Sequence, residues 1–249
     1  MTNVVICGAN GMMGKTVANC ISKRDNCKVV AGIDINTTQY SDFPIYSSPK
    51  DLSESPDVII DYSNPNTLDD LLEYCLVTGT AVVLATTGYS DEQIAKIKKT
   101  SEQIPVFFTF NMSLGINLMV ELAKKAALVL GDRFDIEIIE KHHNLKIDAP
   151  SGTALMLANA INEVYDNSLQ FIYDRHSHRK KRDKKEIGIH AVRGGTIVGE
   201  HEVIFAGSDE VITISHSAAS KTVFAEGSIN AAIFLKGKQA GLYDMSNLV

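Results

Sequence analysis

Short apolar runs alternate with helical segments through the first half of the chain, and this alternation is the strongest constraint on its fold. The runs expected to be strands buried on both faces are 3–7 (NVVIC), 28–34, 57–61, 81–85 and 105–110. Helices are expected at 13–23, 64–78 and 91–104. A strand–helix–strand rhythm predicts a parallel, doubly wound sheet whose ligands lie at the carboxyl ends of the strands.

The pattern changes after a long helix expected at 116–130. A strand-like run at 135–140 is followed by a helix at 153–165, and a last helix at 222–236 ends at Gly237, a residue suited to terminating a helix. Between 187 and 217, strands are expected without intervening helices, separated by glycine-containing turns. Such strands usually pair antiparallel. The second half therefore predicts an α+β domain with a mixed, mostly antiparallel sheet.

A glycine cluster joins the first expected strand to the first expected helix. Gly8, Gly11 and Gly14 allow a tight turn and close backbone approach to a pyrophosphate, and the helix start offers free N–H groups to the anion. Asp34 ends the next strand, 20 residues after Gly14, where a carboxylate meets the adenosine ribose. The alternative is a plain strand-to-helix turn. We predict a Rossmann-like dinucleotide site that includes the turn residues Gly8, Ala9, Asn10, Gly11, Met12, Met13 and Gly14.

Asp34 also predicts which nicotinamide cofactor is preferred. A carboxylate accepts a hydrogen bond from a ribose 2′-OH but repels a 2′-phosphate, and residues 35–37 supply no Arg or Lys. We therefore expect NADH to be preferred, while Lys15 keeps NADPH possible. Two more strand ends could lie over the nicotinamide ribose and ring, or could be only helix caps and turns. Their residues are Ala85, Thr86 and Thr87, and Thr109, Phe110, Asn111 and Met112.

Residues 140–154 (EKHHNLKIDAPSGTA) gather groups suited to proton transfer and anion binding. His142 and His143 are adjacent on a strand end and should point to opposite sides, so a shared metal ion is not favoured, and we assign no metal ligand. Taken singly, these residues could be a packed histidine, a solvated Lys146 and an ordinary helix start. Together they describe a pocket for a small anionic substrate that takes up a proton. The contacts expected at the helix start are Ser151, Gly152 and Thr153.

Bulk properties narrow the class of protein. The net charge of −6 argues against nucleic acid as a partner. No apolar run approaches the roughly 20 residues that span a bilayer, so no membrane partner is expected. The first strand begins almost at Met1, which leaves no room for a signal peptide. Cys7, Cys20, Cys27 and Cys75 show neither disulfide-scaffold density nor C-x-x-C spacing, which predicts reduced thiols in a cytoplasmic protein.

The motifs resemble the 4-hydroxy-tetrahydrodipicolinate reductase (dihydrodipicolinate reductase) family over nearly the whole chain. They include GANGMMG, DVIIDYSNP, ATTGYS, FNMSLGINLM, VRGGTIVGEHEVIF, SHSAASKTVFAEG and the specific E-x-H-H-x-x-K-x-D-x-P-S-G-T block. The resemblance implies reduction of a cyclic imine dicarboxylate to tetrahydrodipicolinate with NAD(P)H, on the route to diaminopimelate and lysine. It also implies that His142 is the proton donor, that Lys146 is a second donor, and that His143, Gly152 and Thr153 contact the substrate.

The family resemblance further implies a homotetramer assembled through a substrate-binding and oligomerisation domain, 114–222, and a dinucleotide-binding domain made of 1–113 with 223–249. Two positions and one segment depart from the family. Met12 and Lys221 stand where many members of the family have arginine. Methionine at position 12 removes a cation that could bind the 2′-phosphate of NADPH. Lysine at position 221 cannot make the two parallel hydrogen bonds that an arginine makes to an anion. Segment 175–185 is short and carries seven Lys/Arg with one Asp. We interpret this segment as a solvated loop. The alternative is that its positive charge helps to steer a dianionic substrate to the site.

Two other functions fit the two-domain plan less well. An aldehyde or semialdehyde dehydrogenase that acylates needs a nucleophilic cysteine, and none of the four cysteines lies in the second half of the chain. A nucleotide-sensing regulator would keep the glycine turn and lose the chemistry, whereas the His-His-Lys-Ser-Gly-Thr set is intact.

Overall fold

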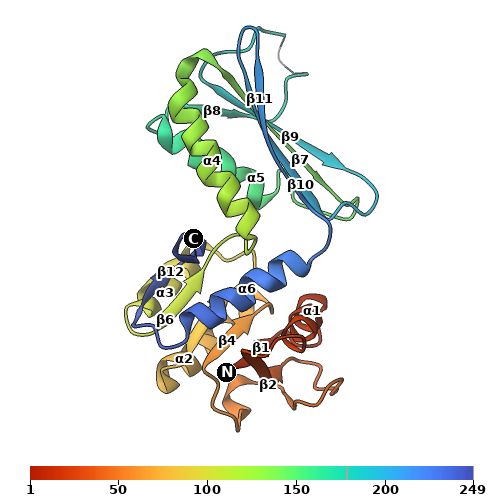
Figure 1. The fold of residues 1–249 in the computed structure, drawn as a ribbon, viewed down its shortest axis with the longest axis vertical. Helices are drawn as coiled ribbons and strands as arrows, with labels where there is room; N and C mark the ends of the chain where they lie inside the picture. The colour runs from red at the N-terminus through yellow and green to blue at the C-terminus, as the bar shows by residue number, and fades with distance from the viewer. Residues whose placement is uncertain (178, 249) are drawn as a thin grey trace. The chain divides into compact units, whose positions relative to one another are not determined.

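The computed structural model describes residues 1–177 and 179–248, so His178 in the basic segment and Val249 at the end of the predicted first domain lie outside the described residues. The chain divides into two compact units. Unit 1 contains Met1–Ser113 and Lys221–Val249, and unit 2 contains Leu114–Ser220. No helix in the described part of the chain is long and apolar enough to cross a membrane. Each unit has its own sheet and its own hydrophobic core (Figure 1).

Unit 1 is built on a seven-stranded sheet in which every pairing is parallel. The predicted doubly wound parallel sheet is confirmed. Its order is β12-β6-β5-β4-β1-β2-β3, so the winding direction reverses at β1, which pairs with both β2 and β4. The strands are β1 (Thr2–Cys7), β2 (Cys27–Ile33), β3 (Ile45–Tyr46), β4 (Val58–Asp61), β5 (Ala81–Leu84), β6 (Pro105–Phe108) and β12 (Gly241–Tyr243).

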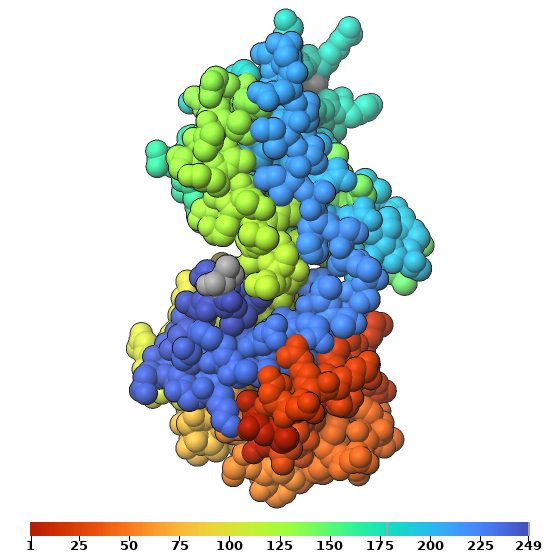
Figure 2. Space-filling view, in the orientation of Figure 1, coloured from red at the N-terminus to blue at the C-terminus, as the bar shows by residue number. Residues whose placement is uncertain are grey.

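Helices cover both faces of this sheet because its strands are apolar on both faces. In β1, Val4 and Ile6 face a core that includes α1 (Met12–Ile21) and α6 (Thr222–Leu235), whereas Val5 and Cys7 face α2 (Leu68–Thr78) and α3 (Asp91–Ser101). In Figure 2, α6 (blue) lies along α1 (red). The predicted helix 64–78 begins as the 3-10 turn η2 (Pro65–Thr67), and short 3-10 turns also occur at η1 (Pro49–Asp51) and η4 (Met245–Leu248).

Unit 2 packs two helices against one face of a five-stranded sheet. The helices are α4 (Leu114–Leu130) and α5 (Gly152–Val164), and η3 (Gly131–Arg133) follows α4. The strand order is β11-β10-β7-β9-β8, which puts β7 at the centre. The core is formed by inward side chains such as Ile138, Val203 and Phe205 against Leu157 and Ile161. The strands are β7 (Asp135–His142), β8 (Gln170–Ile172), β9 (Glu186–Arg193), β10 (Gly199–Ala206) and β11 (Val211–Ala218).

The mixed sheet predicted for the second unit is confirmed. The β7–β10 and β10–β11 pairs are antiparallel, while the β7–β9 pair and the short β8–β9 pair are parallel. Two connections account for the parallel pairs. Helix α5 leads from β7 to the unpredicted strand β8, and 173–185 returns the chain from β8 to the start of its neighbour β9, as a crossover between parallel strands must.

Ion pairs hold the basic segment 175–185 against the acidic residues of β7 and β9. Arg175 contacts Glu137 and Glu186 at 2.7 and 2.8 Å, and Arg182 contacts Asp135 and Glu137 at 3.1 and 3.0 Å. Lys180 and Lys184 add pairs with Glu186 and Asp135. Much of the positive charge of this segment is therefore neutralised locally, and the segment is not simply a solvated loop.

The third glycine of the turn predicts a specific cost of substitution. A Cβ on Gly14 would lie 2.2 Å from the Gly8 carbonyl oxygen and 2.8 Å from the Ala9 Cα, both main-chain atoms that cannot move away cheaply. A Cβ on Gly11 would lie 3.1 Å from the same oxygen. We expect Gly14→Ala to lower the free energy of unfolding by about 1–3 kcal/mol. Gly11→Ala should cost clearly less in the same urea titration, and equal stabilities would contradict this packing argument.

Candidate active site

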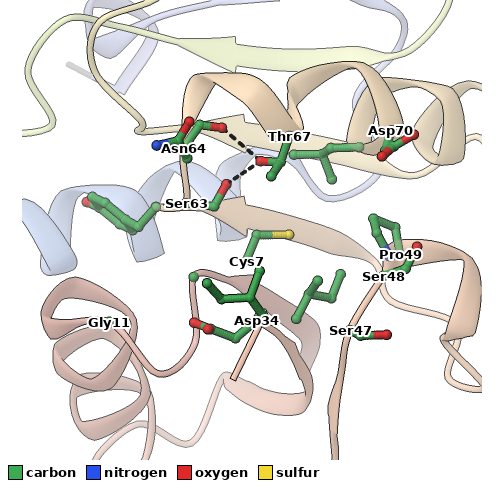
Figure 3. Close-up of a pocket in the computed structure, with 15 residues that line it drawn as sticks. Cys7, Gly11, Asp34, Ser47, Ser48, Pro49, Ser63, Asn64, Thr67 and Asp70 are labelled. Carbon is green, nitrogen blue, oxygen red and sulfur yellow. Dashed lines mark hydrogen bonds between the residues drawn. The ribbon is translucent and has the colours of Figure 1, made fainter. Parts of the chain in front are cut away.

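A cavity opens at the carboxyl edge of the parallel sheet, where the strand order reverses between β1 and β4. Its volume is about 330 Å³, within the range of small-molecule sites. Gly8 and Gly11 from the glycine turn and Asp34 after β2 line it, and Figure 3 labels Gly11 and Asp34 among the lining residues. The crevice at such a reversal is where doubly wound sheets bind nucleotides. The residues present therefore fit the adenosine half of a dinucleotide.

Two backbone N–H groups hold the Asp34 carboxylate in this cavity. Asn10 N–H donates to one oxygen at 2.9 Å and Asn36 N–H donates to the other at 3.0 Å. The Asn10 side chain also donates to the carbonyls of Asn36 and Thr38, which ties the glycine turn to the loop after β2. Lys15, the candidate partner for a 2′-phosphate, has its ammonium 5.3 Å from the centre of the Tyr40 ring.

A buried carboxylate, Asp61, organises the two loops at the ends of β4 and β5. Its side chain accepts hydrogen bonds from Thr86 Oγ1 at 2.8 Å, from Tyr89 OH at 3.0 Å, and from the backbone N–H and hydroxyl of Ser63. Burial raises the pKa of Asp61, although these hydrogen bonds oppose that shift. Thr86 is buried and its hydroxyl binds Asp61, which makes this residue a support for the loop.

The remaining predicted cofactor residues divide into open and buried positions. Phe110 is 62% exposed and its ring packs edge-on against Phe108. Met12 is 68% exposed, whereas the side chain of Met112 is buried in the core of unit 1. Sequence reasoning missed much of the cavity lining because it weighed only the glycine turn, Asp34 and two later strand ends. The missed residues include Ser47, Ser48 and Pro49 before and in η1, and Tyr62, Ser63, Asn64 and Thr67 after β4. The signal for the second group was the motif DYSNP at the end of a predicted strand.

In unit 2, His142 is the last residue of the central strand β7 and is 9% exposed. Its Nδ1 lies 2.6 Å from a carboxylate oxygen of Glu140, two residues earlier on the same strand. Gly199 of β10 lies opposite, and a Cβ there would be 3.2 Å from His142 Nε2. Burial lowers the pKa of His142, while the hydrogen bond and charge of Glu140 oppose that shift.

Glu140 is fully buried and receives four donated hydrogen bonds. Arg193 at the end of β9 binds both carboxylate oxygens at 2.7 Å, and the backbone N–H of Ser151 donates at 2.9 Å. The fourth donor is His142. Burial alone would raise the pKa of Glu140, but the bonds from Arg193, His142 and Ser151 outweigh it and lower the pKa. Glu140 is therefore an ionised carboxylate in contact with His142.

The loop after β7 carries Lys146 and Asp148, whose ammonium and carboxylate groups are 2.8 Å apart. This contact orients Lys146, whereas the start of α5 is capped by Ser151 rather than by Asp148. His143 is partly buried, and its Nδ1 has no hydrogen-bond partner among the described residues.

Helix α5 begins at Gly152, one residue before the expected start, with Ser151 as its N-cap. The Ser151 hydroxyl accepts from Ala154 N–H at 3.2 Å and also lies 3.1 Å from Nε2 of His201 on β10. Burial and the nearby His142 lower the pKa of His201 to about 4, so this histidine is neutral near pH 7. The ring of His201 packs edge-on against His142, with centroids 5.3 Å apart. Ser151, Gly152 and Thr153 therefore form a helix start whose backbone N–H groups favour an anion.

Sequence reasoning found the contiguous part of this cluster and missed Glu140, Arg193 and His201. Arg193 and His201 are brought in by strand register, since Arg193 pairs with His142 and His201 pairs with Glu140. Among the described residues, no group of three His, Cys, Asp or Glu side chains could hold a metal ion.

Comparison with known proteins decides the family. The family model "Dihydrodipicolinate reductase, N-terminus" matches residues 2–112, and "Dihydrodipicolinate reductase, C-terminus" matches residues 115–249. The chain belongs to the dihydrodipicolinate reductase family. It is therefore a nicotinamide-dependent oxidoreductase of lysine and diaminopimelate biosynthesis, and the family resemblance read from the motifs is confirmed.

Relatives of this reductase share its full length. The chain is 51% identical over 249 residues to the 4-hydroxy-tetrahydrodipicolinate reductase of Caldanaerobacter subterraneus subsp. tengcongensis, covering 100% of this chain and 98% of the relative. It is 46% identical to the protein of that name from Clostridium tetani, covering 98% and 96%. A dipicolinate-bound dihydrodipicolinate reductase from Paenisporosarcina sp. TG-14 superposes with a TM-score of 0.79 at 28% identity, covering 100% of both chains.

Proposed function

We propose a role for each site residue of this reductase in the reduction of 4-hydroxy-tetrahydrodipicolinate, a cyclic imine dicarboxylate, to tetrahydrodipicolinate. Unit 1 would bind NAD(P)H and unit 2 the substrate. The observation that carries the proposal is the 2.6 Å contact between His142 Nδ1 and the buried Glu140, beside the anion-binding start of α5. It supplies a positioned proton donor next to groups suited to binding carboxylates.

The cofactor contacts proposed for unit 1 lie at or beyond the carboxyl ends of β1, β2, β5 and β6. When bound, the nicotinamide supplies the hydride. The glycine turn would receive the pyrophosphate at the start of α1, and Asp34 would receive the adenosine ribose. The full set proposed is Gly8, Ala9, Asn10, Gly11, Met12, Met13, Gly14, Asp34, Ala85, Thr86, Thr87, Thr109, Phe110, Asn111 and Met112.

A preference for NADH over NADPH is the finer part of this proposal. The Asp34 carboxylate is oriented by two backbone N–H groups, so it cannot turn away cheaply from a 2′-phosphate. The ammonium of Lys15 is placed over Tyr40 rather than paired with Asp34. Both features support repulsion of the additional phosphate charge.

His142 is the proposed proton donor to the substrate. Because Nδ1 is held by Glu140, Nε2 is the nitrogen that remains for the substrate. The missing Cβ of Gly199 leaves room beside that nitrogen. Lys146, ion-paired with Asp148 on the adjacent loop, is the proposed second donor.

The two substrate carboxylates are proposed to contact Lys146, His143 and the helix start formed by Ser151, Gly152 and Thr153. Lys146 offers a fixed positive charge, and the start of α5 offers the positive end of the helix dipole. This arrangement suits a small dianion and requires no metal ion.

We expect kcat/KM to be higher with NADH than with NADPH, roughly tenfold or more, because a like charge would be placed against Asp34. Asp34→Asn should lower the ratio of kcat/KM with NADH to kcat/KM with NADPH, mainly by raising kcat/KM with NADPH. Asp42 is an exposed carboxylate on the following loop, and Asp42→Asn is the matched control. Initial rates with each cofactor measure the ratio. A tenfold advantage for NADPH in the unaltered protein would sink the proposal.

Two substitutions in unit 2 should separate proton donation from substrate binding. His142→Gln should lower kcat by about 100-fold or more, because a positioned acid contributes that much, with little change in NADH affinity. Lys146→Ala should raise KM for the dicarboxylate about tenfold to 100-fold and also reduce kcat. The assay follows NADH absorbance with substrate made by a coupled synthase. A fully active His142→Gln variant that folds normally would remove His142 from the mechanism.

A homotetramer in the cytoplasm is proposed from the family likeness. The free edge of β11 supports assembly through unit 2, since Val211 and Ile212 there are 64% and 37% exposed. Four buried cysteines without disulfides support a reducing compartment. Analytical ultracentrifugation should show one species of four chains at micromolar concentration, and a monomer would refute this assembly.

A further inference from the structure

We propose that Glu140 is a positioning residue for the reduction, which orients His142 and keeps it able to carry a second proton. The inference rests on the proposed role of His142. Glu140 is 0% exposed and is held in place by contacts from within the chain. Its four contacts come from three different elements, β7, β9 and the start of α5.

Every group that contacts Glu140 is a donor or can be one. Arg193 and the Ser151 N–H can only donate, and His142 Nδ1 donates when it carries a proton. An ionised carboxylate accepts all of these bonds at once. An amide of the same shape would turn its NH₂ group toward a donor and lose at least one of them. The site therefore demands the charge of Glu140 as well as its shape.

The contact with Nδ1 determines which proton His142 can give. With Nδ1–H held by the carboxylate, the imidazolium carries its second proton on Nε2. On donation the Nε2–H bond breaks, its electron pair stays on the nitrogen, and the proton goes to the substrate. The product is a neutral ring that keeps Nδ1–H on Glu140. The carboxylate thus stabilises the charged donor before transfer.

Charged and titratable groups approach His142 from each neighbouring element. Glu140 lies on its own strand, Arg193 on β9, His201 on β10 and Lys146 on the following loop. Arg193 and Lys146 disfavour a positive ring, and His201 is neutral near pH 7. Among these groups Glu140 is the one that favours the imidazolium.

Arg193 extends the same arrangement to the substrate-binding loop. Besides Glu140, its guanidinium donates to the carbonyl of Asp148 at 2.6 Å and to that of Val192 at 2.8 Å. Asp148 lies on the loop after β7, and its side-chain carboxylate pairs with Lys146. Glu140 and Arg193 together therefore fix the strand end, the loop and the helix start relative to one another.

The test compares Glu140→Gln with Glu202→Gln. Glu202 lies on the adjacent strand β10 and pairs with Lys141 at 2.7 Å, so its replacement removes one charge from the same sheet without touching His142. In the pH profile of kcat, activity should fall as pH rises and His142 loses its second proton. Glu140→Gln should lower kcat at neutral pH tenfold or more and move this fall about 1 to 2 pH units lower. Glu202→Gln should leave both kcat and the proton concentration at which activity falls within about twofold of the parent values.

Two further measurements keep the outcome decisive. Nitrogen chemical shifts of labelled histidine should show Nδ1–H for neutral His142 in the parent and a changed protonation pattern in Glu140→Gln. If Glu140→Gln does not fold, Glu140→Asp retains the charge and should keep the pH at which activity falls near that of the parent while lowering kcat. If the pH profile of kcat is unshifted in Glu140→Gln while His142→Gln is inactive, the proposed role of Glu140 is overturned and the proposed role of His142 stands. A fully active His142→Gln variant overturns the proposed function instead.

Discussion

The parallel pairing of β1 with both β2 and β4 is the constraint on which unit 1 depends. A sheet of this kind must bury both faces, so the helices α1 and α6 occupy one face and α2 and α3 the other. Only the edge at the strand ends then remains open to a ligand. At β1 the winding reverses, and the cavity that Gly8 and Asp34 line lies at this point of the sheet.

Two buried carboxylates at strand ends illustrate two solutions to the same electrostatic problem. Asp61 at the end of β4 is surrounded by the neutral donors Ser63, Thr86 and Tyr89, and burial raises its pKa. Glu140 near the end of β7 receives a bidentate arginine, and its pKa is lowered. The first can organise loops without a fixed charge, whereas the second supplies a permanent negative charge. Only the second arrangement can support a protonated histidine.

The chain's long elements and contiguous motifs could be read from the sequence, because periodicity and local chemistry carry that information. The strands β3, β8 and β12 have only two or three residues, too few to show a period. The positions of the parallel pairs in the second sheet could not be read from the sequence, because α5 looked like a separate element rather than a crossover. The ion pairs of segment 175–185 were also invisible, since Asp135 and Glu137 lie about forty residues earlier.

The most informative residues of the candidate site were hidden by the same lack of long-range information. His142, Lys146 and Ser151 fall within one short stretch, so their chemistry could be weighed together. Arg193 is 51 residues from His142, yet the β7–β9 register makes the two direct neighbours. A shift of that register by one residue would send the Arg193 side chain to the opposite face and leave Glu140 buried without its cation. The strand pairing therefore contributes to the chemistry of the site as directly as the motif does.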